Sequence, residues 1–229
     1  MTLRVALFDV DGTLTTAHTW QAYFAAFAHF SLQTATRRLF FLIHYPLYFA
    51  RRLRLLGEER FRTWWASHLS WVLRGLTPEA TAPLWAWAVE TYLAPHWRED
   101  MLQRLATHRQ QGDKVLLVSS APTLLLEAIA RHIGADAVVG TRPALSHGRY
   151  TGGIVPPVCI GHTKRTLTEH TLAALGWEVD YAASAAYADS ITDVPLLEMV
   201  GYPHAVYPDA ALRALARQRH WPIIDAQAG

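Results

Sequence analysis

Residues 3–15 of the chain have the sequence LRVALFDVDGTLT, and this stretch decides the predicted fold. Its first six residues form a short apolar run, which is typical of a buried β-strand. Asp9 and Asp11 follow the run directly, and because they are two residues apart their side chains point the same way. Gly12 then lets the chain turn sharply. The stretch therefore predicts a strand that carries two carboxylates to one edge of a sheet.

The rest of the chain divides into an all-helical block and a block of alternating strands and helices. From residue 17 to 92, apolar and aromatic residues recur at helical spacing, which predicts four helices and no strand. Thr77 and Pro78 mark the start of one of them, because Thr is a favoured N-cap and Pro is favoured in the first turn.

The second block begins near residue 95 and predicts a parallel sheet. We expect strands at 114–118, 136–139, 184–188, 204–207 and 221–224, a hairpin at 141–155, and helices at 98–110, 122–133, 163–175, 192–199 and 209–219. Strands that alternate with helices are typical of a doubly wound, mostly parallel sheet. We therefore predict an α/β fold whose core is residues 1–15 and 95–229, with an all-helical cap, residues 16–94, inserted after the first strand.

Polar side chains recur where the predicted strands end, which is where open α/β sheets bind their ligands. Ser119 and Ser120 follow the strand at 114–118, and Lys164 lies at a helix start. Asp189 and Asp193 follow the strand at 184–188. Together with the two acids after the first strand, these residues predict one polar site at the carboxyl edge of the sheet.

The residue types in this site favour phosphate chemistry. Clustered carboxylates without Cys or His partners favour a hard cation such as Mg²⁺. Lysine is a good point-charge partner for phosphate, and hydroxyls or helix N-terminal amides can hold its oxygens. One carboxylate can attack phosphorus to give an aspartyl-phosphate, while a second exchanges protons with the leaving group and water.

These residues and their order resemble the haloacid dehalogenase superfamily of phosphatases. The DxDGTLT stretch resembles its first motif, the strand ending at Ser119 its second, Lys164 its third and the DSxxD segment its fourth. The insertion after the first motif is similar to the phosphoserine-phosphatase-like subclass IB. The fourth motif departs from the usual pattern, because Ala188 replaces a Gly.

The resemblance implies roles for individual residues. It makes Asp9 the nucleophile, with one oxygen on Mg²⁺, and Asp11 the general acid and base. It implies that Ser119 and the amide of Ser120 bind the phosphoryl group and that Lys164 offsets the negative charge there.

The resemblance also implies a metal site and a second residue close to it. The expected Mg²⁺ ligands are Asp9, the backbone carbonyl of Asp11, and Asp189. Asp193 is expected to act nearby, through water or through Lys164. The scarcity of lysine supports the assignment of Lys164. The chain has 2 Lys and 19 Arg, and a Lys where Arg is otherwise preferred suits a site that needs a compact charge.

Three functions remain open from the sequence. The first is a Mg²⁺-dependent phosphomonoester hydrolase that acts through an aspartyl-phosphate. The second is a phosphotransferase of the same fold, which passes the phosphoryl group to another alcohol. The third is a non-catalytic module that binds phosphate or membrane. The 12 His show no metal-ligand spacing, and a net charge of +2 without any nucleic-acid motif predicts no nucleic-acid partner.

The predicted cap gives the only hint of the substrate. From Gly12 to Gly57 there is no Asp or Glu, while five Arg and ten aromatic residues occur. Phosphoserine phosphatases place a Glu early in the cap, so phosphoserine is not the expected substrate unless Glu58 or Glu59 folds back. We hypothesise a small organic or lipid-like phosphate, met at a membrane surface through the cap. The competing interpretation is that the aromatic residues pack the cap itself.

Composition predicts a folded protein of a reducing compartment. The chain has 229 residues, and a fraction of 17% charged residues leaves much to bury. Cys159 is the only cysteine, and no apolar stretch of signal-peptide length precedes Asp9. We expect a cytoplasmic protein, in peripheral contact with a membrane at most, and the sequence leaves its oligomeric state open.

Overall fold

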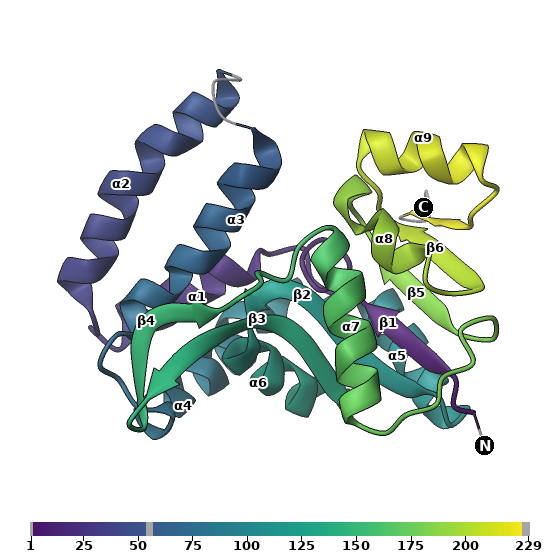
Figure 1. Cartoon of the computed structure of the whole chain (residues 1–229), viewed down its shortest axis with the longest axis horizontal. Coiled ribbons are helices and arrows are strands. Elements are labelled where there is room, and N and C mark those ends of the chain that lie inside the picture. The colour runs from purple at the N-terminus through teal and green to yellow at the C-terminus, as the bar shows by residue number, and fades with distance from the viewer. Residues whose placement is uncertain (1, 54–56, 226–229) are drawn as a thin grey trace.

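The computed structural model describes residues 2–53 and 57–225 and confirms the α/β fold. A seven-stranded sheet has the order β4-β3-β2-β1-β5-β6-β7, and every neighbouring pair is parallel except β3 with β4 (Figure 1). The strands are β1 (Val5–Phe8), β2 (Lys114–Pro122), β3 (Ala137–Ser146), β4 (Arg149–Val155), β5 (Ala185–Ala188), β6 (Tyr202–Val206) and β7 (Ile223–Ile224).

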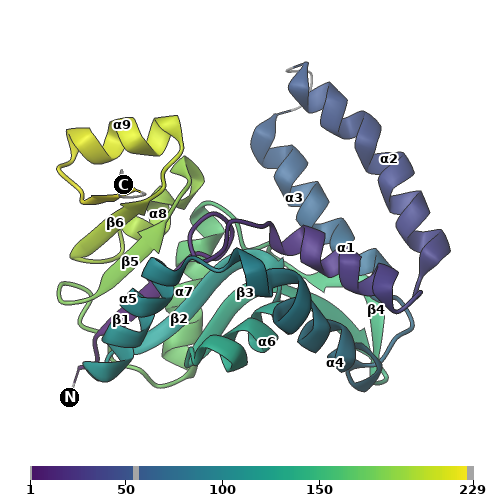
Figure 2. The ribbon, with the colours of Figure 1, turned by 180° about the vertical axis from the view of Figure 1, so that it is seen from behind.

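Helices cover both faces of the sheet, as the doubly wound prediction requires. On one face lies α7 (His162–Ala174), in front of the sheet in Figure 1. The opposite face carries α5 (Glu99–Gln110) and α6 (Thr123–Ile133), which are in front in Figure 2. The chain after β5 forms α8 (Val194–Leu197) and α9 (Ala210–Gln218). The four-residue β1 is fully buried at the centre, so its carboxyl end lies at the middle of the sheet edge.

The two faces of the sheet bury separate apolar clusters. Ala6 and Phe8 of β1 belong to the cluster under α5 and α6, whereas Val5 and Leu7 belong to the cluster under α7 and α8. This alternation follows from the two-residue period of a strand. It places Asp9 immediately beyond a fully packed strand, so the position of its backbone is fixed.

Two predicted boundaries were wrong around the second strand. The strand runs on to Pro122, so Ser119 and Ser120 lie inside it and not after it. Between Val118 and Pro122 the register against β3 shifts, which takes the intervening residues out of the regular ladder. The predicted short strand at 136–139 continues without a break into the hairpin, as the single long β3.

The predicted helical block is helical throughout its described part. It contains α1 (Thr19–His29), α2 (Thr34–Arg52), α3 (Glu58–His68) and α4 (Pro78–Trp87), followed by a π-helical turn and a short 3-10 segment. A 3-10 turn (Leu69–Leu73) follows α3. The hydroxyl of Thr77 accepts a hydrogen bond from the Ala80 amide at 3.3 Å, so the predicted N-cap is confirmed.

The block does not stand apart from the sheet as a whole. Figure 2 shows α4 beside α6, whereas α2 and α3 rise together beyond the end of the sheet that carries β4. One apolar cluster joins Phe8 of β1 to Tyr23 of α1 and Trp85 of α4. The division at residues 16 and 94 stays a prediction. Among the described residues, no helix combines the length and apolar character needed to cross a membrane.

Candidate active site

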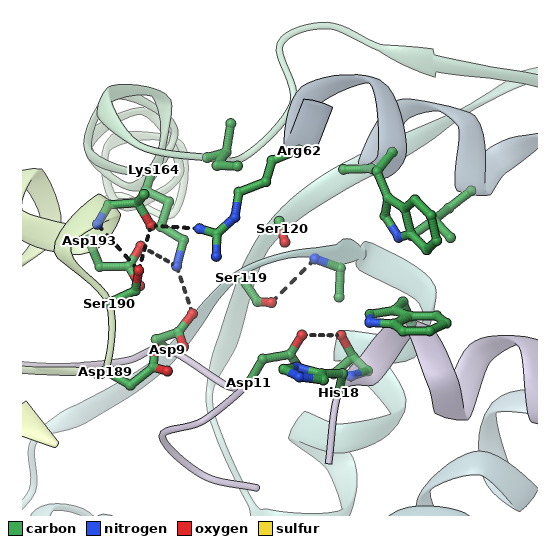
Figure 3. Close-up of a pocket in the computed structure, with 18 of the residues that line it drawn as sticks. Asp9, Asp11, His18, Arg62, Ser119, Ser120, Lys164, Asp189, Ser190 and Asp193 are labelled. Carbon is green, nitrogen blue, oxygen red and sulfur yellow. Dashed lines mark hydrogen bonds and ion pairs between the residues drawn. The ribbon is translucent and has the colours of Figure 1, made fainter. Parts of the chain in front are cut away.

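All seven residues predicted for the site line one cavity of about 550 Å³. The cavity lies between the carboxyl edge of the sheet and the helices α1, α2 and α3 (Figure 3). The core supplies the predicted residues, from the ends of β1, β2 and β5 and the start of α7: Asp9, Asp11, Ser119, Ser120, Lys164, Asp189 and Asp193.

Lys164 connects two acids that are far apart in the sequence. Its Nζ lies 2.6 Å from Oδ1 of Asp9 and 2.7 Å from Oδ1 of Asp193. All three side chains are at least 94% buried. Lys164 lies in the first turn of α7, after Gly161, whose φ of +54° is accessible mainly to glycine. The turn into α7 therefore places one ammonium group against the carboxyl edge of the sheet.

The electrostatic environment raises the pKa values of the acids. Burial raises the pKa of Asp9 well above its usual value, and the charges of Asp193 and Asp189 raise it further, against the opposing effect of Lys164. Burial, followed by the charge of Asp193, raises the pKa of Asp189 to about 7. The pKa of Lys164 is raised by the two acids that it contacts, against the effect of burial. The cluster therefore holds more negative charge than one lysine can offset.

This excess of negative charge fits a divalent cation. Carboxylate oxygens of Asp9, Asp189 and Asp193 lie within 4.8 Å of one another. When all three carboxylates are ionised, one ammonium leaves two net negative charges, and oxygen donors are those that Mg²⁺ prefers. The carboxylate of Asp11 is not in this group, whereas that of Asp193 is. The metal ligands assigned from the sequence stay a prediction, and the residues present fit the ion.

Small residues lie next to the acids at positions 12 and 188. Gly12 has a φ of +81°, and a Cβ on it would lie 2.1 Å from Oδ2 of Asp189. Only glycine suits this position, both for its backbone and for the space available. Ala188, which replaces the expected Gly, is the fully buried last residue of β5, in register with Ala205 of β6. Its methyl group fits in a regular strand.

Asp11 is held by the first residue of the first cap helix. The Thr19 amide donates to Oδ1 of Asp11 at 2.7 Å, and the Thr19 hydroxyl donates to Oδ2 at 3.0 Å. Burial raises the pKa of Asp11, and these two hydrogen bonds oppose the rise. Sequence reasoning missed Thr19, whose only signal is its place at a helix start eight residues after the acid. The position of α1 thus sets the orientation of the carboxylate of Asp11.

Ser119 and Ser120 line the same cavity as Asp9, the candidate nucleophile. The Ser119 hydroxyl is buried and accepts a hydrogen bond from the Ala121 amide at 3.2 Å. That bond leaves the hydroxyl proton to be donated into the cavity. The carbonyl of Ser120 accepts a hydrogen bond from the Thr141 hydroxyl at 2.8 Å, which anchors the irregular end of β2.

The cap lines the cavity with residues that the sequence did not single out. Arg62 of α3 reaches over the cavity, and its Nη1 donates to the Thr192 hydroxyl at 3.1 Å (Figure 3). Aromatic side chains form the wall beside it: Trp20, Tyr48, Phe61 and Trp65. Nothing in the sequence separates Arg62 from other helical arginines, because only the packing of α3 directs it inward.

Several known proteins similar to this chain are hydrolases or phosphatases by name. A family model described as haloacid dehalogenase-like hydrolase matches residues 6–198. A phosphoserine phosphatase of Mycobacterium tuberculosis is 31% identical, over 96% of this chain and 70% of its own length. A histidinol-phosphatase of Neisseria meningitidis is 31% identical, over 58% of this chain and 61% of its own length.

Other relatives are longer or are named without an activity. An "inhibition of morphological differentiation protein" of Streptomyces azureus is 35% identical over 73% of this chain, and the match spans 58% of that protein. The matches to the next curated relatives span 41% of their length. This chain thus spans about half the length of the first of these relatives.

Solved structures agree with the fold. A Bordetella pertussis protein of unknown function has a TM-score of 0.82 and 28% identity, over 98% of this chain and 99% of its own. A substrate-bound phosphoserine phosphatase has a TM-score of 0.61 and 16% identity, over 98% of this chain and 93% of its own, which shows a shared fold. With the family model matching most of its length, this chain belongs to the haloacid dehalogenase-like hydrolases.

Proposed function

We propose that this protein is a Mg²⁺-dependent phosphomonoester hydrolase that acts through an aspartyl-phosphate on Asp9. One observation carries the proposal: the buried ammonium of Lys164 joins Asp9 to Asp193 at 2.6 and 2.7 Å, with Asp189 beside them. A purely structural ion pair needs only one acid for its lysine. Three acids around one lysine suit a site that binds both a dication and a phosphate.

The first step is attack by the Asp9 carboxylate on phosphorus. A bond forms from the carboxylate oxygen to phosphorus, and the bond from phosphorus to the leaving oxygen breaks. Asp11, oriented by Thr19, gives its proton to that oxygen, so the alcohol leaves neutral. Ser119 and the Ser120 amide hold the phosphoryl oxygens, and Lys164 offsets their charge.

The second step returns Asp9 to its starting state. Asp11, now a carboxylate, takes a proton from a water molecule as the water oxygen attacks phosphorus. The bond between phosphorus and the Asp9 oxygen breaks, and inorganic phosphate leaves. Mg²⁺ would be held by Asp9, Asp189 and the backbone carbonyl of Asp11. Asp193 would act next to this site through its contact with Lys164. When bound, the ion supplies positive charge at the transferring phosphoryl group.

The walls of the cavity favour a leaving group with an apolar part. Trp20, Phe61 and Trp65 offer aromatic surface above the acids, and Arg62 adds a positive charge. Among the described side chains that line the cavity, every acid comes from the core, so none there meets a substrate ammonium from the cap side. The side chains of Glu58 and Glu59, weighed above for that role, lie outside the described ones. A small organic or lipid-like phosphate suits these walls better than phosphoserine.

Phosphate release measured over a panel of phosphomonoesters tests the proposal. The panel contains phosphoserine, histidinol phosphate, an aryl phosphate and a lysophosphatidate, each with Mg²⁺ and with a chelator. We expect turnover in Mg²⁺ alone, abolished by Asp9→Asn and retained by Asp136→Asn, which removes an acid outside the site. Phosphate release by Asp9→Asn at the wild-type rate would contradict the assignment of the nucleophile.

The same assay separates hydrolysis from transfer. An added alcohol that receives the phosphoryl group in place of water identifies a phosphotransferase, because the aspartyl-phosphate is common to both reactions. Preference for the lysophosphatidate supports a lipid-like substrate, whereas preference for phosphoserine would contradict the interpretation of the cavity walls.

A further inference from the structure

The second helix exposes a continuous apolar face to solvent. We define the α2 outer face as four residues of α2 and the residue that follows its end: Leu39, Leu42, Ile43, Phe49 and Leu53. The spacing of the four helical residues places them on one side of the helix. Their exposed fractions are 50%, 72%, 39%, 57% and 70%. Single exposed apolar residues are common, but a stripe along a whole helix marks an interaction surface.

The opposite side of α2 packs against the rest of the cap. The apolar residues of the outer face are therefore not needed to hold α2 in place. Phe40 and His44 point inward and are fully buried, and their rings stack at 4.0 Å. The Nε2 of His44 lies 2.9 Å from the Nδ1 of His68, at the end of α3. Figure 1 shows α2 at the edge of the molecule, with α3 between it and the rest of the chain. Each residue of the outer face keeps at least 39% of its surface exposed to solvent.

The Asp, Glu, Lys and Arg residues of α2 have one sign of charge, because all of them are arginines. No Asp or Glu occurs from Gly12 to Gly57, and α2 carries arginines at both ends, at positions 37, 38, 51 and 52. Of these, Arg38 is exposed at the start of the helix. Acids return only at Glu58 and Glu59, where α3 begins. An apolar stripe between basic ends fits a flat, negatively charged, partly apolar partner.

We infer that the α2 outer face docks on an anionic membrane surface. A basic helix with an exposed apolar side lies in the plane of such an interface and inserts its apolar residues among the lipids. A second copy of the chain fits this face less well, because two acid-free helices would bring arginine against arginine. The inference concerns α2 alone and does not depend on the proposed phosphatase activity.

Co-sedimentation of the full chain with vesicles tests the inference. One set of vesicles contains phosphatidylcholine alone, and the other contains phosphatidylcholine and phosphatidylglycerol in equal parts. We expect binding to the anionic vesicles only, weakened by salt. Leu42→Glu and Phe49→Glu are each expected to weaken binding about tenfold. Each variant loses one large apolar side chain that would insert among the lipids, and adds a charge that the anionic surface repels.

A matched control is available on the hairpin of the core. Leu145 of β3 has an exposed fraction of 53%, which is similar to the 57% of Phe49. Leu145→Glu therefore makes the same kind of change away from α2. We expect its binding to equal that of the wild type. Failure of the wild type to bind anionic vesicles would overturn the inference, as would equal losses in Leu145→Glu and Phe49→Glu. A dimer in solution that Leu42→Glu dissociates would assign the face to a second copy instead.

Discussion

The chain has two lysines, and their surroundings offer a controlled test of the site. Lys164 is 5% exposed and contacts Asp9 and Asp193, while Asp189 lies within reach of both acids. Lys164→Met keeps the length of the side chain but removes the charge. It leaves three carboxylates within 4.8 Å without a cation. Removal of one partner of a buried ion pair costs about 3–5 kcal/mol of unfolding free energy.

For a chain of this size, that loss lowers the midpoint of thermal unfolding by about 6–20 °C. Lys114 is the control, because its Nζ lies at the same 2.7 Å from an acid, Asp136, but its side chain is 39% exposed. Lys114→Met is expected to cost less than about 1 kcal/mol. The measurement is the unfolding midpoint of both variants in metal-free buffer.

The pH dependence of the Lys164→Met loss provides a second check. Without the ammonium, which opposes the rise, the folded-state pKa of Asp9 lies further above that of the unfolded chain. Groups with raised folded-state pKa values lose stability as pH rises through those values. The destabilisation is therefore expected to be smaller at pH 5 than at pH 8. Equal midpoints for the two lysine variants, or a loss that grows as pH falls, would refute the reasoning.

Three further outcomes are expected. Thr19→Val removes the hydroxyl that donates to Asp11 and is expected to lower kcat about tenfold in steady-state kinetics, whereas Thr19→Ser keeps kcat near the wild type. Mg²⁺ at 100 times its Kd is expected to stabilise the fold by about 2.7 kcal/mol in calorimetry, a gain that Asp189→Asn reduces. Burial lowers the pKa values of His44 and His68, so the unfolded chain takes up protons first and stability is expected to fall with pH below about 6.5. Denaturant titrations at pH 7 and pH 5 measure this loss of unfolding free energy. An equal loss in the variant with Asn at both positions would exclude this pair as its cause.

The core of the fold was predictable because its signals are local. The apolar run that ends at Asp9 is buried on both faces of the sheet, and such runs are hard to mistake. Helix limits followed from residues with a specific role, such as Thr77 as an N-cap and Gly134, whose φ of +80° ends α6. The end of β2 was not predictable, because the shift of register after Val118 depends on the neighbouring strand.

The predicted site residues converge on one cavity because the topology brings strand ends together. Asp9 and Asp189 follow β1 and β5, which are adjacent and parallel, so two segments 180 residues apart in sequence meet. The place of Asp193 depended on packing instead. A short 3-10 turn directs its carboxylate to Lys164, which puts it among the possible metal ligands.

The contrast between positions set by the sheet topology and positions set by packing explains why the chemistry is easier to infer than the substrate. Most of the residues proposed to bind the phosphate lie at strand ends, where spacing in the sequence maps directly onto position in space. Residues that face the leaving group lie on cap helices, where Arg62 and Trp65 differ from their neighbours only in the direction that packing gives them. Composition could predict an aromatic, acid-free cap but not which of its aromatic residues face the cavity. The structure divides them: Phe40 is buried inside the cap, Trp65 lines the cavity and Phe49 lies on the outer face. One insertion can thus serve packing, substrate and surface with three separate sets of side chains, and substitutions in one set are expected to leave the functions of the others intact.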